Sequence, residues 1–237
     1  MIEPKIKSNE VCIFNDYGYK VIDLSSPDEF SRLQEDDDGE FFDAYETITP
    51  ADQNTQNHIR DFYHRFIHDG DKILDLMAGD KSYLPNKNNL EITGLGIKQR
   101  DLDENTCLNH RLIHNVNSKE LLPFSEDYFD LVICTFAIEY MTQPLQIFAE
   151  VARILKSGGY FCIGFSNQYY EKKAIKLWRE NDYKGHMNII LQYFKSTKKF
   201  TDFVCEAWQE NNHLPAEKFI NTQEFSSPAY MIKGTRV

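Results

Sequence analysis

The chain has 237 residues, of which 41% are hydrophobic and 27% charged, and its formal net charge is -11. These proportions are typical of a globular protein and exclude a disordered, collagen-like or fibrous chain. The length fits one α/β domain with an extension. Because the negative charge repels nucleic-acid phosphates and anionic lipids, we expect neither nucleic acid nor a membrane as a partner.

The sequence also predicts a compartment. Its longest nearly apolar run, residues 131–138, is far shorter than the ~20 residues that cross a bilayer. Residues 1–10 are polar and charged, which argues against a secretory signal. The five cysteines never show C-x-x-C spacing, a distribution typical of reduced thiols rather than of disulfides or a zinc site. We therefore expect a cytoplasmic protein with no bound metal.

Residues 1–48 differ from the rest of the chain and are predicted to form an extension. Two short strand-like runs, 11–14 and 19–24, flank the turn residues 16–18, a pattern that predicts a hairpin. The acidic run 35–40 interrupts any packing pattern, and we interpret it as a solvated linker.

Residues 49–237 are predicted to form one α/β domain. A helix begins at Thr49-Pro50, which supply a cap hydroxyl and a first-turn proline, and it ends at Gly70. Another helix begins at Pro144 and is stopped by Gly158-Gly159. Short apolar runs bounded by turn residues predict buried parallel strands at 73–76, 92–97, 111–114, 129–135 and 160–165.

The last third of the chain continues this alternation. We expect a helix around 171–180, a strand at 189–194, a helix at 201–208 and a final strand near 229–233. Strands that alternate with helices in this way predict a doubly wound α/β sheet.

The loop after the first strand, residues 75–81, stands where such sheets usually bind a ligand. A phosphate-binding loop needs G-x-G-x-x-G or G-x-x-x-x-G-K-[ST], and this segment supplies only Gly79. A nucleoside triphosphate site and a nicotinamide dinucleotide site are therefore both disfavoured.

Two downstream segments carry a more specific pattern. Residues 122–132 read LPFSEDYFDLV, and they are followed by Glu139-Tyr140, Pro144 and the segment 150–159, EVARILKSGG. This block resembles that of the small-molecule methyltransferases grouped as type 11. The resemblance implies a mostly parallel, seven-stranded sheet, S-adenosylmethionine as the methyl donor and a small molecule as the acceptor.

The first-strand loop adds to this resemblance. Asp75 and Gly79 match the motif D-x-G-x-G-x-G of class I S-adenosylmethionine-dependent methyltransferases, whereas Met77 and Lys81 replace its two outer glycines. The loop is most similar to that of a little-studied branch with an altered motif I. By this resemblance the cofactor-binding residues are Asp75, Met77, Ala78, Gly79, Gly96, Asn115, Val116, Asn117 and Thr135.

Two of these positions depart from the family pattern. Gly96 stands where the family has an acid for the ribose hydroxyls, so we expect weak binding, which Gly96→Asp tightens if the backbone geometry allows that side chain. Asn115 stands near the aspartate that meets the adenine amino group, and an amide carbonyl can still accept that hydrogen bond.

The resemblance implies a mechanism without a fixed catalytic triad. Methyl transfer needs alignment of donor and acceptor, exclusion of water and, for some acceptors, a base. Glu139 and His186 are the candidate bases, and Tyr140 and Asn167 are candidate orienting groups.

A second interpretation stays open. Met77, Lys81 and Gly96 favour a degenerate methyltransferase fold that binds a ligand or a partner without catalysis. The methyl acceptor and the oligomeric state are not indicated by the sequence. We also expect part of residues 1–48 to cover the pocket, because this segment contains aromatic residues that lie among acidic ones. The aromatic residues are Phe14, Tyr17, Tyr19, Phe30, Phe41, Phe42 and Tyr45.

Overall fold

The computed structural model describes residues 22–44, 51–209 and 227–237. The predicted hairpin therefore lies almost wholly outside the described residues, and so does the helix start predicted at Thr49-Pro50. What the structure describes of the extension is the segment 22–44.

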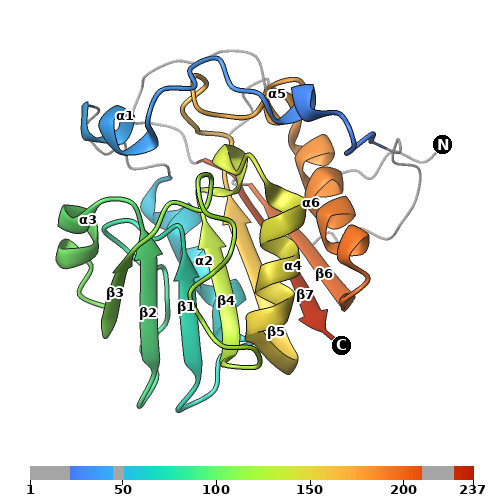
Figure 1. Cartoon of the computed structure of the whole chain (residues 1–237). Coiled ribbons are helices and arrows are strands. Elements are labelled where there is room, and N and C mark those ends of the chain that lie inside the picture. Colours follow the sequence, from blue (N-terminus) through green and yellow to red (C-terminus); the bar gives the residue numbers. More distant parts are fainter. Residues whose placement is uncertain (1–21, 45–50, 210–226) are drawn as a thin grey trace.

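Seven strands of the described chain form one sheet in the order β3-β2-β1-β4-β5-β7-β6 (Figure 1). Their bounds are β1 Lys72–Leu76, β2 Glu91–Gly96, β3 His110–Ile113, β4 Phe129–Thr135, β5 Leu155–Phe165, β6 Phe200–Trp208 and β7 Ala229–Arg236. The pairs from β3 to β5 are parallel, while β7 is antiparallel to both β5 and β6. The predicted doubly wound, mostly parallel seven-stranded sheet is confirmed.

Helices cover both faces of this sheet (Figure 1). They are η1 Pro27–Phe30, α1 Asp38–Ala44, α2 Gln53–His64, α3 Gln99–Glu104, η2 Ile138–Tyr140, α4 Pro144–Ile154, α5 Lys176–Arg179 and α6 Tyr183–Thr197. Residues of α4 and α6 belong to one buried cluster and those of α2 to another. Two apolar layers are what a parallel sheet needs, because its strands are buried on both sides.

The helix α2 shows how local sequence sets one of these layers. Asp52 is its N-cap, and the Asp52 carboxylate accepts a hydrogen bond from the Thr55 N–H at 3.0 Å. Ile59, Phe62 and Tyr63 then lie on one side and are at most 2% exposed. Burying each such side chain stabilises the fold by roughly 1.5 to 3 kcal/mol.

Two elements near the end of the chain are the reverse of those predicted. Residues 189–194, expected as a strand, lie in α6, and residues 201–208, expected as a helix, lie in β6. The helix is buried on more than one side, so its apolar run does not show the helical period. It is capped by Asp182, whose carboxylate accepts from the Gly185 N–H. The strand β6 pairs with β7, which favours its aromatic and β-branched residues.

Two helix predictions are corrected in extent. The helix α4 ends at Ile154 and β5 begins at Leu155, so Gly158 and Gly159 lie inside the strand rather than stopping the helix. The helix expected at 171–180 is limited to α5. The backbone before it is paired with the extension, since Gln34 N–H donates to the Lys172 carbonyl at 2.9 Å.

The acidic run 35–40 is only partly the solvated linker that was expected, since Glu35, Asp36, Asp37 and Glu40 are exposed but Asp38 is not. The helix α1 begins within it at Asp38, and Asp38 is only 5% exposed. Its carboxylate accepts hydrogen bonds from Lys173 at 3.0 Å and from Arg32 at 2.6 Å. A buried carboxylate that is paired in this way can be part of the packed structure.

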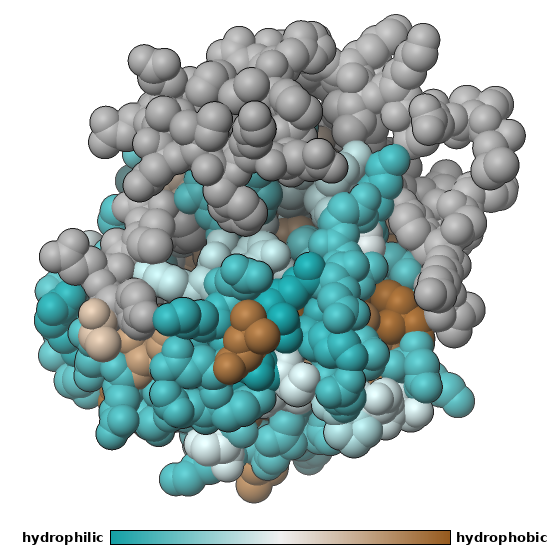
Figure 2. Space-filling view, turned by 90° about the horizontal axis from the view of Figure 1, so that it is seen from above, coloured by the Kyte–Doolittle hydropathy of each residue, from teal (hydrophilic) through white to brown (hydrophobic). Residues whose placement is uncertain are grey.

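The described surface seen from above is mainly hydrophilic, with small separate hydrophobic areas (Figure 2). The large hydrophobic side chains that are exposed among the described residues are Leu33, Ile113, Leu121 and Val237. Single exposed residues of this kind are normal on a globular protein and mark no interface by themselves. None of the described helices is long and apolar enough to span a bilayer.

Candidate functional site

The loop after β1 follows a backbone path that the sequence does not make obvious. Met77 has a φ of 59°, in the left-handed region that glycine adopts without strain. The next residue, Ala78, donates its N–H to the Leu95 carbonyl of β2 at 2.8 Å. Met77 therefore keeps the backbone conformation suited to the glycine it replaces, and its side chain lines the pocket described below.

Asp75 at the end of β1 is hydrogen-bonded to this loop. It is 3% exposed, and its Oδ2 accepts a hydrogen bond from the Ser82 hydroxyl at 2.5 Å. The Asn105 amide donates to the same hydroxyl oxygen at 2.9 Å and to the Gly79 carbonyl at 3.0 Å. Burial raises the pKa of Asp75 to about 7. Asp75 is not among the residues that line the pocket, so its role here is to fix the loop.

Gly96 at the end of β2 lies against the same loop. A Cβ placed on Gly96 would stand 2.4 Å from the Ala78 carbonyl oxygen. No side chain fits at that distance unless the loop moves. The tightening expected from Gly96→Asp depended on the backbone geometry, and this geometry does not allow it, because an aspartate there would displace the loop.

A carboxylate from the extension meets the amides that follow β3. Asn117 donates to Asp38 Oδ2 at 3.0 Å and Asn115 donates to the same atom at 3.5 Å. Burial works to raise the pKa of Asp38, but hydrogen bonds from Asn117, Lys173 and Arg32 outweigh it and lower the pKa. The carboxylate is thus held charged by four donors.

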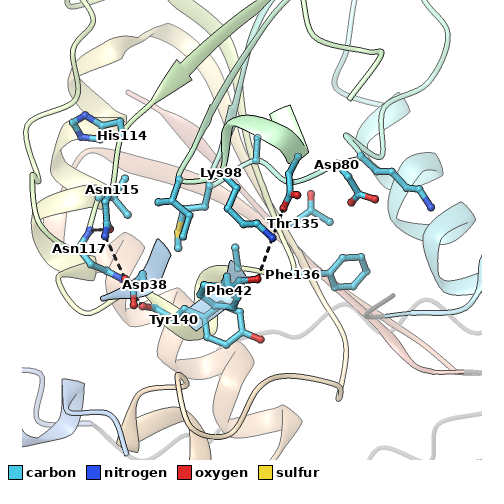
Figure 3. Close-up of a pocket in the computed structure, with 18 of the residues that line it drawn as sticks. Asp38, Phe42, Asp80, Lys98, His114, Asn115, Asn117, Thr135, Phe136 and Tyr140 are labelled. Carbon is cyan, nitrogen blue, oxygen red and sulfur yellow. Dashed lines mark hydrogen bonds and ion pairs between the residues drawn. The ribbon is translucent and has the colours of Figure 1, made fainter. Parts of the chain in front are cut away.

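These elements enclose a pocket at the carboxyl ends of the parallel strands, with a volume of about 190 Å³ (Figure 3). The sequence-predicted residues that line it are Met77, Ala78, Gly79, Asn115, Val116, Asn117, Thr135 and Tyr140. Phe42 of the expected cover and Asp80 and Lys81 of the expected ligand loop also line it. The lining residues that the sequence did not indicate are Asp38, Tyr83, Ile97, Lys98, Asp101, His114, Phe136, Ala137 and Tyr170. The structure therefore brings together most of the predicted cofactor set, without Asp75 and Gly96.

Lys98 connects the end of β2 to the extension. Its ammonium donates to the Phe42 carbonyl at 3.0 Å (Figure 3). The same ammonium lies 3.5 Å from Asp101 Oδ2 and 3.7 Å from Asp43 Oδ1. Phe42 itself contacts Tyr140 and Tyr170 edge to face, with ring centroids 5.6 and 5.7 Å away. The helix α1 thus forms one wall of the pocket.

The three residues predicted as catalytic lie in different places. Tyr140 lines the pocket, and its hydroxyl oxygen accepts the Tyr170 N–H at 2.9 Å. Glu139 is 2% exposed, and burial raises its pKa to about 7. His186 lies on α6, where it stacks on Trp178 and donates from Nε2 to the Trp178 carbonyl at 2.8 Å. Burial lowers the pKa of His186 to about 4. Only Tyr140 among the three lines the pocket.

The comparisons with known proteins agree with this architecture. A SAM dependent methyltransferase from Aquifex aeolicus superposes with a TM-score of 0.53 and 12% sequence identity, covering 84% of this chain and 99% of that one. Residues 79–163 match the family described as a methyltransferase domain. Residues 79–163 are thus similar to a methyltransferase domain, and the sheet has the fold of class I methyltransferases.

Two further proteins illustrate the range of this methyltransferase similarity. The malonyl-[acyl-carrier protein] O-methyltransferase of Marinomonas sp. is 32% identical over 88 residues, which are 35% of this chain and 32% of that enzyme. This chain therefore matches about a third of that relative's length. The phosphoethanolamine N-methyltransferase 2 of Haemonchus contortus, solved with S-adenosyl-L-methionine, has a TM-score of 0.53 and 14% identity, covering 80% of this chain and 54% of that one.

Few sequence patterns indicated the remaining residues that line the pocket. Phe136 follows β4 and has a φ of 54°, which no local pattern indicates. Asp38 comes from the extension and reaches the pocket only through the tertiary fold. Lys98 and Asp101 follow the second strand directly, and their position in the chain was the one available indication that they lie at this edge of the sheet.

Proposed function

We propose that this protein transfers a methyl group from S-adenosylmethionine to a small molecule, and that the donor binds in the pocket between the β1 loop and α1. The observation that carries the proposal is the position of the pocket. It lies beyond the carboxyl ends of parallel strands, at the switch point between β1 and β4, where open α/β sheets bind their ligands.

The residues present fit an adenosyl ligand with one exception. Gly79 lines the pocket, and a Cβ placed on it would meet no atom within 4 Å, so a ligand can approach the backbone there. Val116 supplies an apolar wall, and Asn115 and Asn117 supply polar groups beside it. The exception is Gly96, which offers no acid at the end of β2.

Bound S-adenosylmethionine would supply a sulfonium methyl group that a nucleophile can displace. The chain itself supplies positioning and shielding. Asp75, through Ser82, fixes the loop that carries Gly79. Tyr140 provides a hydroxyl at the pocket wall, and the α1 residue Phe42 excludes water from it. We propose residues 22–44 as the described part of the cover predicted for the extension.

Glu139 and His186 have unequal places in this proposal. Glu139 adjoins Tyr140 and keeps a carboxyl oxygen, Oε2, with no hydrogen-bond partner among the described residues. We keep Glu139 as a candidate base that acts next to Tyr140. His186 is held by Trp178 away from the pocket lining, and we assign it to the packing of α6.

Calorimetric titration of S-adenosylmethionine and S-adenosylhomocysteine tests the donor site. We expect both to bind the unchanged chain, and we expect Gly79→Val to weaken binding at least tenfold, because a branched side chain would fill the space left for the ligand. The open space around Gly79 allows this variant to fold, which circular dichroism checks. A folded Gly79→Val variant with unchanged affinity would move the site elsewhere.

The alternative function is ligand binding without catalysis. Two observations favour binding without catalysis. Met77 places a side chain at a pocket position where the motif has glycine. The pocket volume of about 190 Å³ is below the ~300 to 1,000 Å³ of usual small-molecule pockets. Incubation with S-adenosylmethionine and a small-molecule extract separates the two functions. A methyltransferase releases S-adenosylhomocysteine, whereas a binding protein holds the donor unchanged.

The finer features of the setting are also proposals. A small molecule rather than a nucleic acid or membrane is the proposed acceptor, in keeping with the net charge of -11. The cytoplasm is the proposed compartment, because Cys134 and Cys162 are buried free thiols.

A further inference from the structure

The end of β2 lacks an acid, yet a carboxylate lines the pocket a few residues further along. Asp101 lies on α3, the helix that follows β2, and it is 8% exposed. Its side chain is among those that line the pocket. The Asp101 carboxylate therefore lies at the pocket, whereas Gly96 supplies no carboxylate at the end of β2.

Asp101 also has an oxygen that the described chain leaves unsatisfied. Its Oδ1 is buried and has no hydrogen-bond partner among the described residues. Arg100 Nε lies 3.9 Å from this atom, beyond hydrogen-bond distance, on a side chain that is 72% exposed. The other oxygen, Oδ2, lies 3.5 Å from the Lys98 ammonium. Buried polar atoms almost always have a partner, so Oδ1 requires a donor from outside the described chain.

Two other carboxylates line the pocket and are less suited to this role. Asp38 already accepts hydrogen bonds from four donors, including Asn117 and Lys173. Asp80 follows Gly79 on the β1 loop, and it does not follow β2 in the chain. Asp101 is the one of the three that combines burial, an unsatisfied oxygen and a place directly after β2.

We propose that Asp101 accepts a hydrogen bond from a ribose hydroxyl of the adenosyl ligand through Oδ1, while Oδ2 stays paired with Lys98. The acid that usually closes the second strand in nucleoside-binding α/β sheets is thereby moved onto α3. This inference rests on the proposed function, since it assigns one contact within the same site.

The test combines a protein variant with a ligand variant. Calorimetry compares S-adenosylhomocysteine with analogues that lack the 2′-hydroxyl or the 3′-hydroxyl, on the unchanged chain and on Asp101→Asn. We expect the unchanged chain to bind at least one deoxy analogue about 10 to 100 times more weakly, as for the loss of a hydrogen bond to a charged group. In Asp101→Asn the parent ligand should lose a similar factor and the penalty for the missing hydroxyl should shrink.

Two matched variants control this experiment. Asp103→Asn removes a carboxylate that is 60% exposed on the same helix, and it should leave all affinities unchanged. Asp80→Asn removes another carboxylate that lines the pocket and should leave the penalty for the missing hydroxyl in place. The analogue series on the unchanged chain also needs no folded variant.

The outcomes separate this inference from the proposed function. If the unchanged chain binds S-adenosylhomocysteine but Asp101→Asn binds it equally well with the same hydroxyl penalty, the ribose contact is not made by Asp101 and the inference is overturned alone. Loss of the penalty in Asp80→Asn overturns it as well. If the unchanged chain binds none of these ligands, the proposed function falls and the inference with it.

Discussion

A methionine in a left-handed backbone conformation is the least expected single residue of this structure. Met77 follows β1 with a φ of 59°, a conformation that costs a non-glycine residue roughly 1 to 2 kcal/mol. Its side chain both packs against the core and lines the pocket. Strain of this kind at a pocket wall is commonly retained where it serves binding.

Replacing Met77 by glycine and by alanine tests this strain. Both variants remove the side chain beyond Cβ, but alanine keeps the cost of the positive φ, so we expect Met77→Gly to be more stable than Met77→Ala by about 1 kcal/mol. Urea unfolding measures the difference. An alanine variant as stable as the glycine variant would show that the loop relaxes to another conformation.

Glu139 gives a second prediction at this scale, in the dependence of stability on pH. Burial raises its pKa from 4.5 to about 7. Below pH 4.5 the carboxyl is protonated in both the folded and the unfolded chain. Between pH 4.5 and 7 the unfolded chain releases the proton first, so the stability present at acidic pH is lost as the pH rises toward 7.

We therefore expect Glu139→Gln, which mimics the protonated form, to lack this loss. The difference in unfolding free energy between Glu139→Gln and the unchanged chain should shift in favour of the variant by ~1 to 3 kcal/mol from pH 4.5 to 8. Chemical denaturation across this range measures it. The exposed Glu126→Gln changes the net charge equally and should show no such shift, and parallel curves for Glu139→Gln and the unchanged chain would contradict the prediction.

At the scale of elements, we propose that the helix α1 controls how a ligand reaches the pocket. Lys98 and Asp38 connect α1 to the ends of β2 and β3, and Phe42 lines the pocket. The cavity of about 190 Å³ is below the ~300 to 1,000 Å³ of usual small-molecule pockets, so we expect α1 to move when an adenosyl ligand binds. Once the ligand is bound, it adds contacts that hold α1 in place.

Hydrogen exchange measures this closure. We expect the amides of 38–44 to exchange more slowly when S-adenosylhomocysteine is added, because the bound ligand opposes opening of α1. The amides of α4, on one face of the sheet, serve as the control and should exchange at the same rate in both samples. Equal exchange of 38–44 with and without ligand would contradict the role of α1 as a cover.

The elements also show what the sequence could and could not predict. The first five strands were predicted because their apolar runs are short and bounded by turn residues. The assignments for 189–194 and 201–208 were wrong because a helix buried on several sides and a strand at the sheet edge both hide their periods. The β1 loop was located from motif and topology, whereas Asp38, Phe42 and Asp101 reach the pocket by tertiary contacts that no local pattern encodes.

For the molecule as a whole, two segments that are far apart in the chain pair with each other beside the pocket, namely 31–34 and 172–176. Backbone bonds join Lys176 N–H to the Ser31 carbonyl at 2.8 Å and Gln34 N–H to the Lys172 carbonyl at 2.9 Å. The buried ammonium of Lys173 also donates a hydrogen bond to Asp38 and so joins the same two parts of the chain. The segment 22–44 is therefore packed onto the loop that follows β5. The described part of the extension is thus an integral part of the α/β domain.

The contact between Gly96 and the Ala78 carbonyl has a consequence for redesign of this site. Because a Cβ at position 96 would lie 2.4 Å from that oxygen, an acid can be introduced there only if the neighbouring loop shifts. A single substitution at this position would therefore disturb the loop. A design that places an acid at the end of β2 needs a second change that moves the Ala78 carbonyl away.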